Sequence, residues 1–334
     1  MAKTYYTDLA LDTAEALCGE KTQDFKIDGV TVEKKELSNA EITWVRIINS
    51  DGEKTMGKPV GSYITIESEA MKESDIDVHE EIVAILAEAL STLTANKNAD
   101  IRPDSSVLVV GLGNRSVTPD ALGPNVVSKM LVTRHIMDEL PESTGGKIRQ
   151  VAAVAPGVMG TTGIETFDII KGICDEIKPS LVIAIDALAA RCANRVNATI
   201  QVCDTGLSPG AGMGNNRKVI NENFLGIPVI AVGVPTVVDA ATLVSDTMDL
   251  MLESMLESSE EQESSAFYEM LRNLEEQEKY GLIKQVLDPY MGNMFVTPKE
   301  VDSVIDRLSN IIANALNISL HPGIGKNDIN RFMY

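Results

Sequence analysis

The chain has 334 residues, and 29 Lys and Arg against 49 Asp and Glu give it a formal net charge of −20. This charge argues against direct binding to nucleic acid or to an anionic membrane, because the phosphate groups would be repelled. Hydrophobic residues make up 44% of the chain, which excludes wholesale disorder. None of the four cysteines forms a C-x-x-C pair, which excludes zinc-ribbon and thioredoxin-type motifs. With no secretory signal or apolar run of bilayer length, we expect a cytoplasmic protein.

The N-terminal part of the chain changes its hydrophobic period once. Residues 25–68 alternate apolar and polar side chains, which predicts a small antiparallel sheet. Asp-Gly pairs at 28–29 and 51–52 predict the hairpin turns of that sheet. Residues 74–95 change to a period of 3.6, with one apolar stripe and acidic side chains in the first turns, and this pattern predicts a helix.

From residue 105 onward, short continuous apolar runs alternate with helical patterns. Such strands, rich in Val, Ile and Ala, are typical of a sheet that helices bury on both faces. We therefore expect an α/β fold: a three-layer α/β/α core with a mostly parallel central sheet, and the small antiparallel sheet appended to it. The runs SVLVVGLG, QVAAVAPGV, LVIAIDAL, VNATIQVCD and GIPVIAVGVP are the predicted strands, and helical patterns include VSKMLVTRHIMDEL, GIETFDIIKGICDEI and TVVDAATLVSDTMDLMLESML.

The C-terminal third contains an acidic stretch. Residues 257–279 hold eight acidic and two basic side chains, which favours a solvated helical insertion that we place at 257–290. A last helix is predicted at about 298–317, because Pro298 supplies a helix-start signal. We expect one domain that includes the antiparallel sheet at 25–70.

Two common motifs are incomplete in this chain. Gly111 and Gly113 follow a predicted strand, but Ser116 stands where the dinucleotide motif G-x-G-x-x-G needs a third glycine. Ser208 lies in a G-x-S-x-G match, but the Pro209 and glycines that follow cannot start the helix that a nucleophile elbow requires.

The histidines offer little for metal or triad chemistry. His79 and His135 fall in predicted helices among charged neighbours, and His321 precedes a proline in a loop. A serine hydrolase would need one of the three beside its serine, and three scattered histidines give little for zinc. A metal held by carboxylates stays open as an alternative.

Three aspartates occupy unusual places. Asp186 lies in the apolar run LVIAIDALAA, where a carboxylate is costly unless it is paired or functional. Asp120 lies in the loop after the strand at 107–112, and Asp239 is interpreted as a helix N-cap. Ligands of open α/β sheets bind at the carboxyl ends of the strands, an edge that Asp120 and Asp186 share.

Two carboxylates at one such edge can share a proton. One then activates water as a base while the other protonates the leaving group. The residues alone thus predict a two-carboxylate hydrolase. We take Asp186, in the drier position, as the acid and Asp120 as the base, and the reverse assignment stays open because a coupled pair titrates as a unit. The rival readings are a carboxylate–metal hydrolase and a nucleotide-binding module.

Several long segments resemble the germination protease family of spore-forming bacteria, in collinear order from about residue 6 to 320. The matching segments are VVGLGNRSVTPDALGP, APGVMGTTGIET, IAIDALAAR, NRVNATIQ, GIPVIAVGVPTVVDA and MFVTPKEVD.

The resemblance implies an endopeptidase that starts to degrade small acid-soluble spore proteins at germination, acting in the spore core. It implies an atypical aspartic-type peptidase without a metal or other cofactor, whose two essential aspartates match Asp120 and Asp186. It further implies a homotetramer and a fold similar to hydrogenase-maturation proteases. A metal-dependent peptidase related to those proteases is the alternative.

The resemblance also implies a zymogen that cuts itself. The family cleaves after an acidic residue. The four residues that follow the cut are a large apolar residue, Ala, any residue and an acidic residue. Residues 7–12, TDLALD, fit this pattern, which predicts a cut between Asp8 and Leu9 that releases residues 1–8 and leaves 9–334 as the peptidase.

A chain at −20 that recognises acidic sites needs local positive charge. Arg115 lies near Asp120 in the sequence, Arg191 lies near Asp186, and Arg217 and Lys218 lie in the glycine-rich loop. We expect the substrate contacts among these residues. The alternative is that each forms a surface ion pair of little energetic value.

Overall fold

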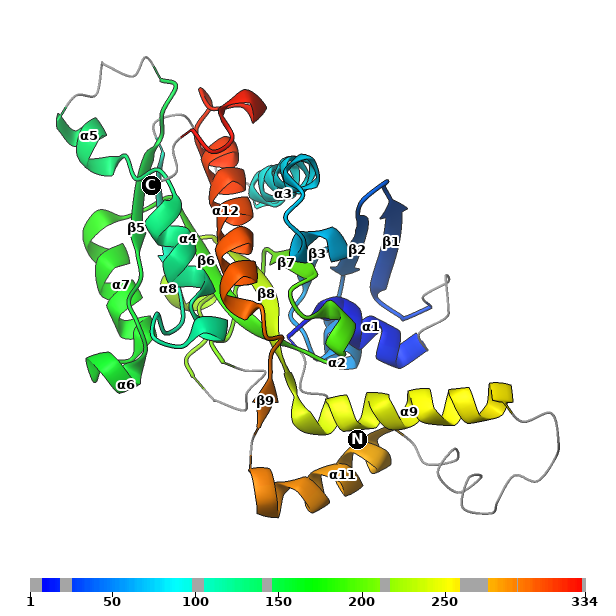
Figure 1. Cartoon of the computed structure of the whole chain (residues 1–334). Coiled ribbons are helices and arrows are strands. Elements are labelled where there is room, and N and C mark those ends of the chain that lie inside the picture. Colours follow the sequence, from blue (N-terminus) through cyan, green and yellow to red (C-terminus); the bar gives the residue numbers. More distant parts are fainter. Residues whose placement is uncertain are drawn as a thin grey trace.

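A computed structural model gives the fold of the chain (Figure 1). The structure describes residues 8–18, 26–97, 105–139, 146–210, 217–258, 276–292 and 294–331. The strands are β1 (Val30–Glu36), β2 (Glu41–Ile47), β3 (Gly61–Glu67), β4 (Ser106–Gly111), β5 (Gln150–Val154), β6 (Leu181–Ala190), β7 (Thr199–Cys203), β8 (Val229–Asp239) and β9 (Phe295–Val296). All nine belong to one sheet.

The sheet has a parallel half and an antiparallel half. Its strand order is β1-β2-β3-β7-β8-β6-β4-β5, with β9 paired to the end of β8. Strands β5, β4, β6 and β8 run parallel to one another. Strands β7, β3, β2 and β1 follow in antiparallel pairs. The carboxyl ends of the parallel strands therefore meet at one edge of the molecule.

Helices cover both faces of this sheet, which confirms the expected three-layer α/β/α class. The helices are α1 (Ala10–Cys18), α2 (Ser50–Met56), α3 (Ile76–Asn96), α4 (Leu122–Lys129), α5 (Arg134–Glu139), α6 (Met159–Thr162), α7 (Thr166–Ile177), α8 (Glu222–Leu225), α9 (Ala240–Ser258), α11 (Glu276–Met291) and α12 (Val301–Leu320). On one face, α3, α4 and α12 pack on the largest apolar core. On the other, α7 packs on the parallel half and α1 on the antiparallel half.

Helices α9 and α11 lie together beside the central layers, below them in Figure 1. They flank the acidic stretch predicted as a helical insertion, and its residues 259–275 lie outside the described residues. No helix in the described ranges is both long enough and apolar enough to cross a membrane.

The N-terminal strands extend the central sheet instead of forming a separate one. Strand β3 pairs with β7 over five residue pairs, so the antiparallel strands continue the core. The hairpin expected at Asp51-Gly52 is wrong, because these residues begin α2. The Asn49 side chain caps that helix by accepting hydrogen bonds from the backbone N–H groups of Asp51 and Gly52, at 3.1 and 3.0 Å.

Two further boundaries differ from the sequence prediction. The predicted helix after residue 125 divides into α4 and α5, since the backbone turns extended at Met130. Strand β8 continues to Asp239, four residues into the segment predicted as a helix, and the short strand β9 pairs with its end. Asp239 accepts a hydrogen bond from Ala241 N at 3.2 Å, which agrees with the N-cap interpretation.

Glycines let α4 return tightly over the end of β4. A Cβ on Gly111 would lie 2.1 Å from the carbonyl oxygen of Gly123, and a Cβ on Gly123 would lie 2.4 Å from that of Leu112. Only hydrogen atoms fit between these backbones. This close approach fixes the loop that joins β4 to α4, and therefore the position of Asp120 within it.

Gly111→Ala tests this close approach. We expect a loss of roughly 1–3 kcal/mol in the free energy of unfolding, because the new methyl group overpacks against backbone. Gly172→Ala in α7 is the matched control, since a Cβ added there would meet nothing within 4 Å and alanine favours helix. Chemical denaturation measures both; equal stability of the two variants would contradict the prediction.

Candidate active site

Asp120 is positioned by the loop after β4. It ends a short 3-10 turn, Thr118–Asp120, and its Oδ2 accepts a hydrogen bond from Asn114 N at 2.8 Å. The loop closes on itself at Gly113, whose φ of +111° favours glycine. A Cβ there would lie 2.0 Å from the Asp120 carbonyl oxygen. The loop thus holds the Asp120 carboxylate by local backbone geometry.

Asp186 is positioned by the sheet itself. Strand β4 ends at Gly111, which pairs with Ile185 of β6, and Leu112 N donates to the Ile185 carbonyl at 2.8 Å. Asp186 is therefore the first residue of β6 that lies beyond the last pairing with β4. Its side chain is 5% exposed, and its Oδ1 accepts a hydrogen bond from Ala187 N at 3.0 Å.

Both carboxylates line one cavity of about 40 Å³ at the carboxyl edge of the parallel strands. This volume is enough for a water molecule. Arg217 lines the same cavity, as does Thr166, the first residue of α7. Among the described residues, the lining is Leu112, Gly113, Asp120, Gly157, Val158, Thr166, Asp186, Ala187, Pro209, Gly210 and Arg217.

The environment raises the pKa of both aspartates. Burial is the largest cause for each. The pKa of Asp186 lies well above its usual range, because the negative charges of Asp120 and Asp8 add to the effect of burial. The positive charge of Arg217 lowers both pKa values in part, and so does a backbone N–H on each carboxylate. The geometry thus favours a protonated Asp186 beside an Asp120 that ionises more readily.

The N-terminal segment, residues 8–18, lies against the same edge of the sheet. The Asp8 carboxylate accepts a hydrogen bond from Ala189 N at 3.2 Å, and Asp8 N donates to the Ala189 carbonyl at 3.5 Å. Leu9, Ala10 and Leu11, which follow, are fully buried. The peptide bond between Asp8 and Leu9 is therefore held three residues along β6 from Asp186.

A buried arginine anchors the next part of this segment. Arg195 pairs with Asp12 and also contacts Glu15 at 2.7 Å and Glu67 at 2.8 Å. Burial alone would lower the pKa of Arg195, but the charges of Asp12, Glu67 and Glu15 together raise it. Since the Asp12 side chain is fully buried, this ion pair fixes the start of α1 on the sheet.

The other predicted site residues lie outside the cavity. The exposed Arg115 donates to the Pro124 carbonyl at 3.2 Å, and Arg191 donates its backbone N–H to Asp12 at 3.2 Å. Lys218 forms an exposed ion pair with Asp168 at 2.7 Å. Ser208 is not among the lining residues, although Pro209 and Gly210 are.

None of the three histidines, all in the described ranges, lines the cavity. His321 is fully buried at the end of α12, where its Nδ1 accepts a hydrogen bond from Arg149 N at 3.2 Å. Burial lowers its pKa to about 4, which is typical of a neutral structural histidine. Within the described part of the chain, no three or more His, Cys, Asp or Glu side chains form a metal-binding group.

Sequence reasoning missed three residues that contact the N-terminal segment: Lys58, Arg195 and Gln201. Gln201 carried a signal, because it is a polar side chain inside the apolar run of β7. Lys58 carried none, since it lies in the loop that leads from α2 into β3.

Comparison with known proteins decides the family. A family model described as germination protease matches residues 7–266 and 255–333. The chain belongs to the germination protease family. The germination protease of Caldanaerobacter subterraneus subsp. tengcongensis is 46% identical over 328 residues, covering 98% of each chain. That of Clostridium acetobutylicum is 47% identical over 327 residues, again covering 98% of each, and that of Bacillus subtilis 43% over 349 residues, covering 96% of this chain and 94% of the relative.

The protease also matches a solved structure, the NiFe hydrogenase maturation protease HycI from Thermococcus kodakarensis. The match covers 68% of this chain and 98% of the other, with 14% identity and a TM-score of 0.30. A similarity at this level supports no conclusion about the site of the protease.

Asp186→Asn tests the burial of the carboxylate. A raised pKa in the folded state means that ionisation of Asp186 costs stability once the pH exceeds its unfolded-state value. We therefore expect the asparagine variant to melt at a higher temperature than wild type at neutral pH. This advantage should shrink as the pH falls toward 4, because the carboxyl of the unfolded wild-type chain then begins to be protonated as well.

Thermal unfolding from pH 4 to 8 measures this effect. The exposed Asp175 on α7 supplies the control variant Asp175→Asn, which should show no such pH-dependent gain. A melting temperature of Asp186→Asn that stays below wild type at every pH would contradict the raised pKa.

Proposed function

We propose that this protease is an atypical aspartic-type endopeptidase in which Asp120 and Asp186 activate a water molecule. The observation that supports the proposal is the convergence of both carboxylates on one cavity, in environments that separate their protonation behaviour. Such a pair shares a proton, so that one member acts as base while the other acts as acid.

In this mechanism Asp120 is the base and Asp186 the acid. Asp120 takes a proton from water, the resulting hydroxide attacks the substrate carbonyl carbon, and Asp186 protonates the leaving nitrogen. Arg217 supplies positive charge beside the pair, which supports its expected role in holding an acidic substrate. The contacts described above for Arg115 and Arg191 do not place these two residues beside the aspartate pair.

We also propose that the chain is a zymogen that cuts itself between Asp8 and Leu9 and releases residues 1–8. The docking of this bond along β6 supports the proposal. The contacts also fit the expected cleavage pattern: the acid before the cut meets Ala189 N–H, Leu9 and Ala10 are enclosed, and the acid at position 12 meets Arg195.

The names of the relatives support a proposal for the substrate class. Because they are named germination proteases, we propose that this chain degrades small acid-soluble spore proteins in the spore core during germination. Cleavage after acidic residues is consistent with the Asp8 contacts and with Arg217 beside the aspartate pair.

Asparagine substitutions test the aspartate pair. We expect Asp120→Asn and Asp186→Asn each to slow release of residues 1–8 by on the order of 10²–10⁴-fold, the usual contribution of a positioned acid or base. Mass spectrometry of the purified full chain, incubated at mildly acidic pH, measures the release, with Asp175→Asn as control. Wild-type rates in either variant would refute the mechanism. Loss of activity on treatment with a chelator would instead support the metal-dependent alternative.

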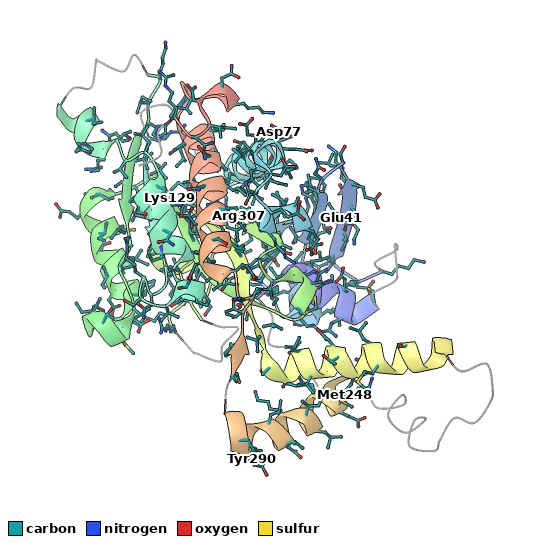
Figure 2. The ribbon with its side chains drawn as sticks, viewed as in Figure 1. Glu41, Asp77, Lys129, Met248, Tyr290 and Arg307 are labelled. Carbon is teal, nitrogen blue, oxygen red and sulfur yellow. The ribbon has the colours of Figure 1, made fainter. Side chains whose placement is uncertain are left out.

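We propose in addition that the protease assembles as a homotetramer through α9 and α11. These helices pack on each other and leave large apolar side chains exposed, which is typical of an interaction surface. Tyr290, 87% exposed, lies on α11 far from the central sheet (Figure 2). Among the described side chains of α9 and α11, the exposed large apolar residues are Val244, Leu250, Met251, Leu282, Val286 and Tyr290.

The double variant Leu282→Asp/Val286→Asp tests this surface. We expect its mass in solution to fall to that of a smaller assembly, because two charges would be buried at the contact. Size-exclusion chromatography with light scattering measures the mass. Ile76→Asp is the control, since Ile76 is equally exposed but lies on α3. An unchanged tetramer in the double variant would exclude this surface, and a monomeric wild type would exclude the tetramer.

A further inference from the structure

The carbonyl oxygen of Asp8 is held between two side-chain donors from distant parts of the chain. Lys58 Nζ donates to it at 3.0 Å and Gln201 Nε2 at 3.3 Å. The amide oxygen of Gln201 also accepts a hydrogen bond from Ala10 N at 2.7 Å. Gln201 therefore contacts the Asp8–Leu9 peptide group and the peptide group that follows it, and so fixes the orientation of the bond.

The fold brings Lys58 to this carbonyl through a braced loop. Helix α2 ends at Gly57, whose φ of +62° reverses the chain, and Lys58 follows directly. The Tyr63 hydroxyl donates to the Pro59 carbonyl at 2.8 Å, which ties the loop to β3. Burial lowers the pKa of the Lys58 ammonium. Its hydrogen bond to the Asp8 carbonyl is part-buried, so water screens it only in part.

Gln201 and Asp186 belong to one row across the sheet. Gly233 of β8 pairs with Gln201 of β7 on one side and with Asp186 of β6 on the other. Paired residues of neighbouring strands point to the same face, so the two side chains stand on one face about 10 Å apart. Gly233 lies between them, and the Leu188 side chain of β6 covers it on that face.

We infer that Lys58 and Gln201 form an oxyanion-binding pair for the cleaved carbonyl. The inference rests on the proposed self-cleavage at Asp8–Leu9 and adds two catalytic residues to it. Both donors already contact the oxygen on which negative charge develops, and neither belongs to the carboxylate cavity. Fixed donors of this kind stabilise a transition state because they need no reorientation during the reaction.

The chemical step balances with solvent water as the only co-reactant. The water oxygen bonds to the Asp8 carbonyl carbon while Asp120 takes one water proton. The carbonyl π electrons move to the oxygen, whose negative charge the Lys58 ammonium and the Gln201 amide stabilise. Reformation of the carbonyl breaks the bond to Leu9 N, which takes the proton of Asp186. The products are a carboxyl group on Asp8 and an amine on Leu9.

Lys58→Met removes one donor while keeping an unbranched side chain. We expect it to slow release of residues 1–8 by roughly 10²-fold, the lower end for loss of one oxyanion donor. Lys54→Met is the matched control, because Lys54 lies on α2, the helix that precedes Lys58, with its side chain 79% exposed. Mass spectrometry of the purified full chain gives the rate, and hydrogen exchange of residues 8–18 reports whether the segment stays docked.

The outcomes separate this inference from the function on which it rests. A loss of at least tenfold in Lys58→Met, with exchange protection of residues 8–18 unchanged, supports it. A smaller loss overturns it while leaving the aspartate mechanism standing. A slow variant whose segment loses protection also overturns it, because Lys58 would then hold the segment without activating the carbonyl. A wild-type chain that never cuts at Asp8–Leu9 removes the proposed self-processing and this inference together.

Discussion

Strand β6 is longer than its neighbour β4, and the site depends on this difference. Beyond Ile185, the edge of β6 that faced β4 presents backbone groups that need hydrogen-bond partners. The N-terminal segment supplies partners at Ala189, through the backbone and carboxylate of Asp8. The same difference in length leaves Asp186 just past the last β4 pairing, where the loop that carries Asp120 turns back over the sheet.

The charged side chains around this edge form two groups. Like charges repel in the first group, and opposite charges attract in the second. Burial together with the negative charges of Asp120 and Asp8 disfavours a charge on Asp186, and Arg217 offsets only part of this effect, so protonation of Asp186 is favoured. Around Arg195, by contrast, three carboxylates contact one buried guanidinium. Burial strengthens the attraction between these opposite charges because little water screens it. The first arrangement is strained and suited to proton transfer, whereas the second holds α1 in place.

The sequence predicted much of this architecture because its signals are local. Continuous apolar strands and helical periods located β4 to β8, α3, α7 and α12, and Asp186 was noticeable as a charge within a buried strand. The helix at Asp51-Gly52 was not predictable from its turn-like dipeptide, because the capping side chain of Asn49 decided it. Nor could Lys58 or Arg195 be predicted as site residues. Their roles arise from contacts with Asp8 and Asp12, which lie 50 and 183 positions away in the sequence. Such contacts depend on strand order, which hydrophobic patterns do not contain.

The N-terminal segment is covalently joined to the helix that packs beside it, and this has a consequence for any free peptide. A tethered ligand occupies its site at an effective concentration on the order of millimolar or higher. An external chain that docked along β6 would therefore compete with this segment, whose local concentration does not change when the protein is diluted. Breaking a bond within this segment would be a first-order event in each molecule, whereas attack on a separate chain would wait for that edge to be vacated.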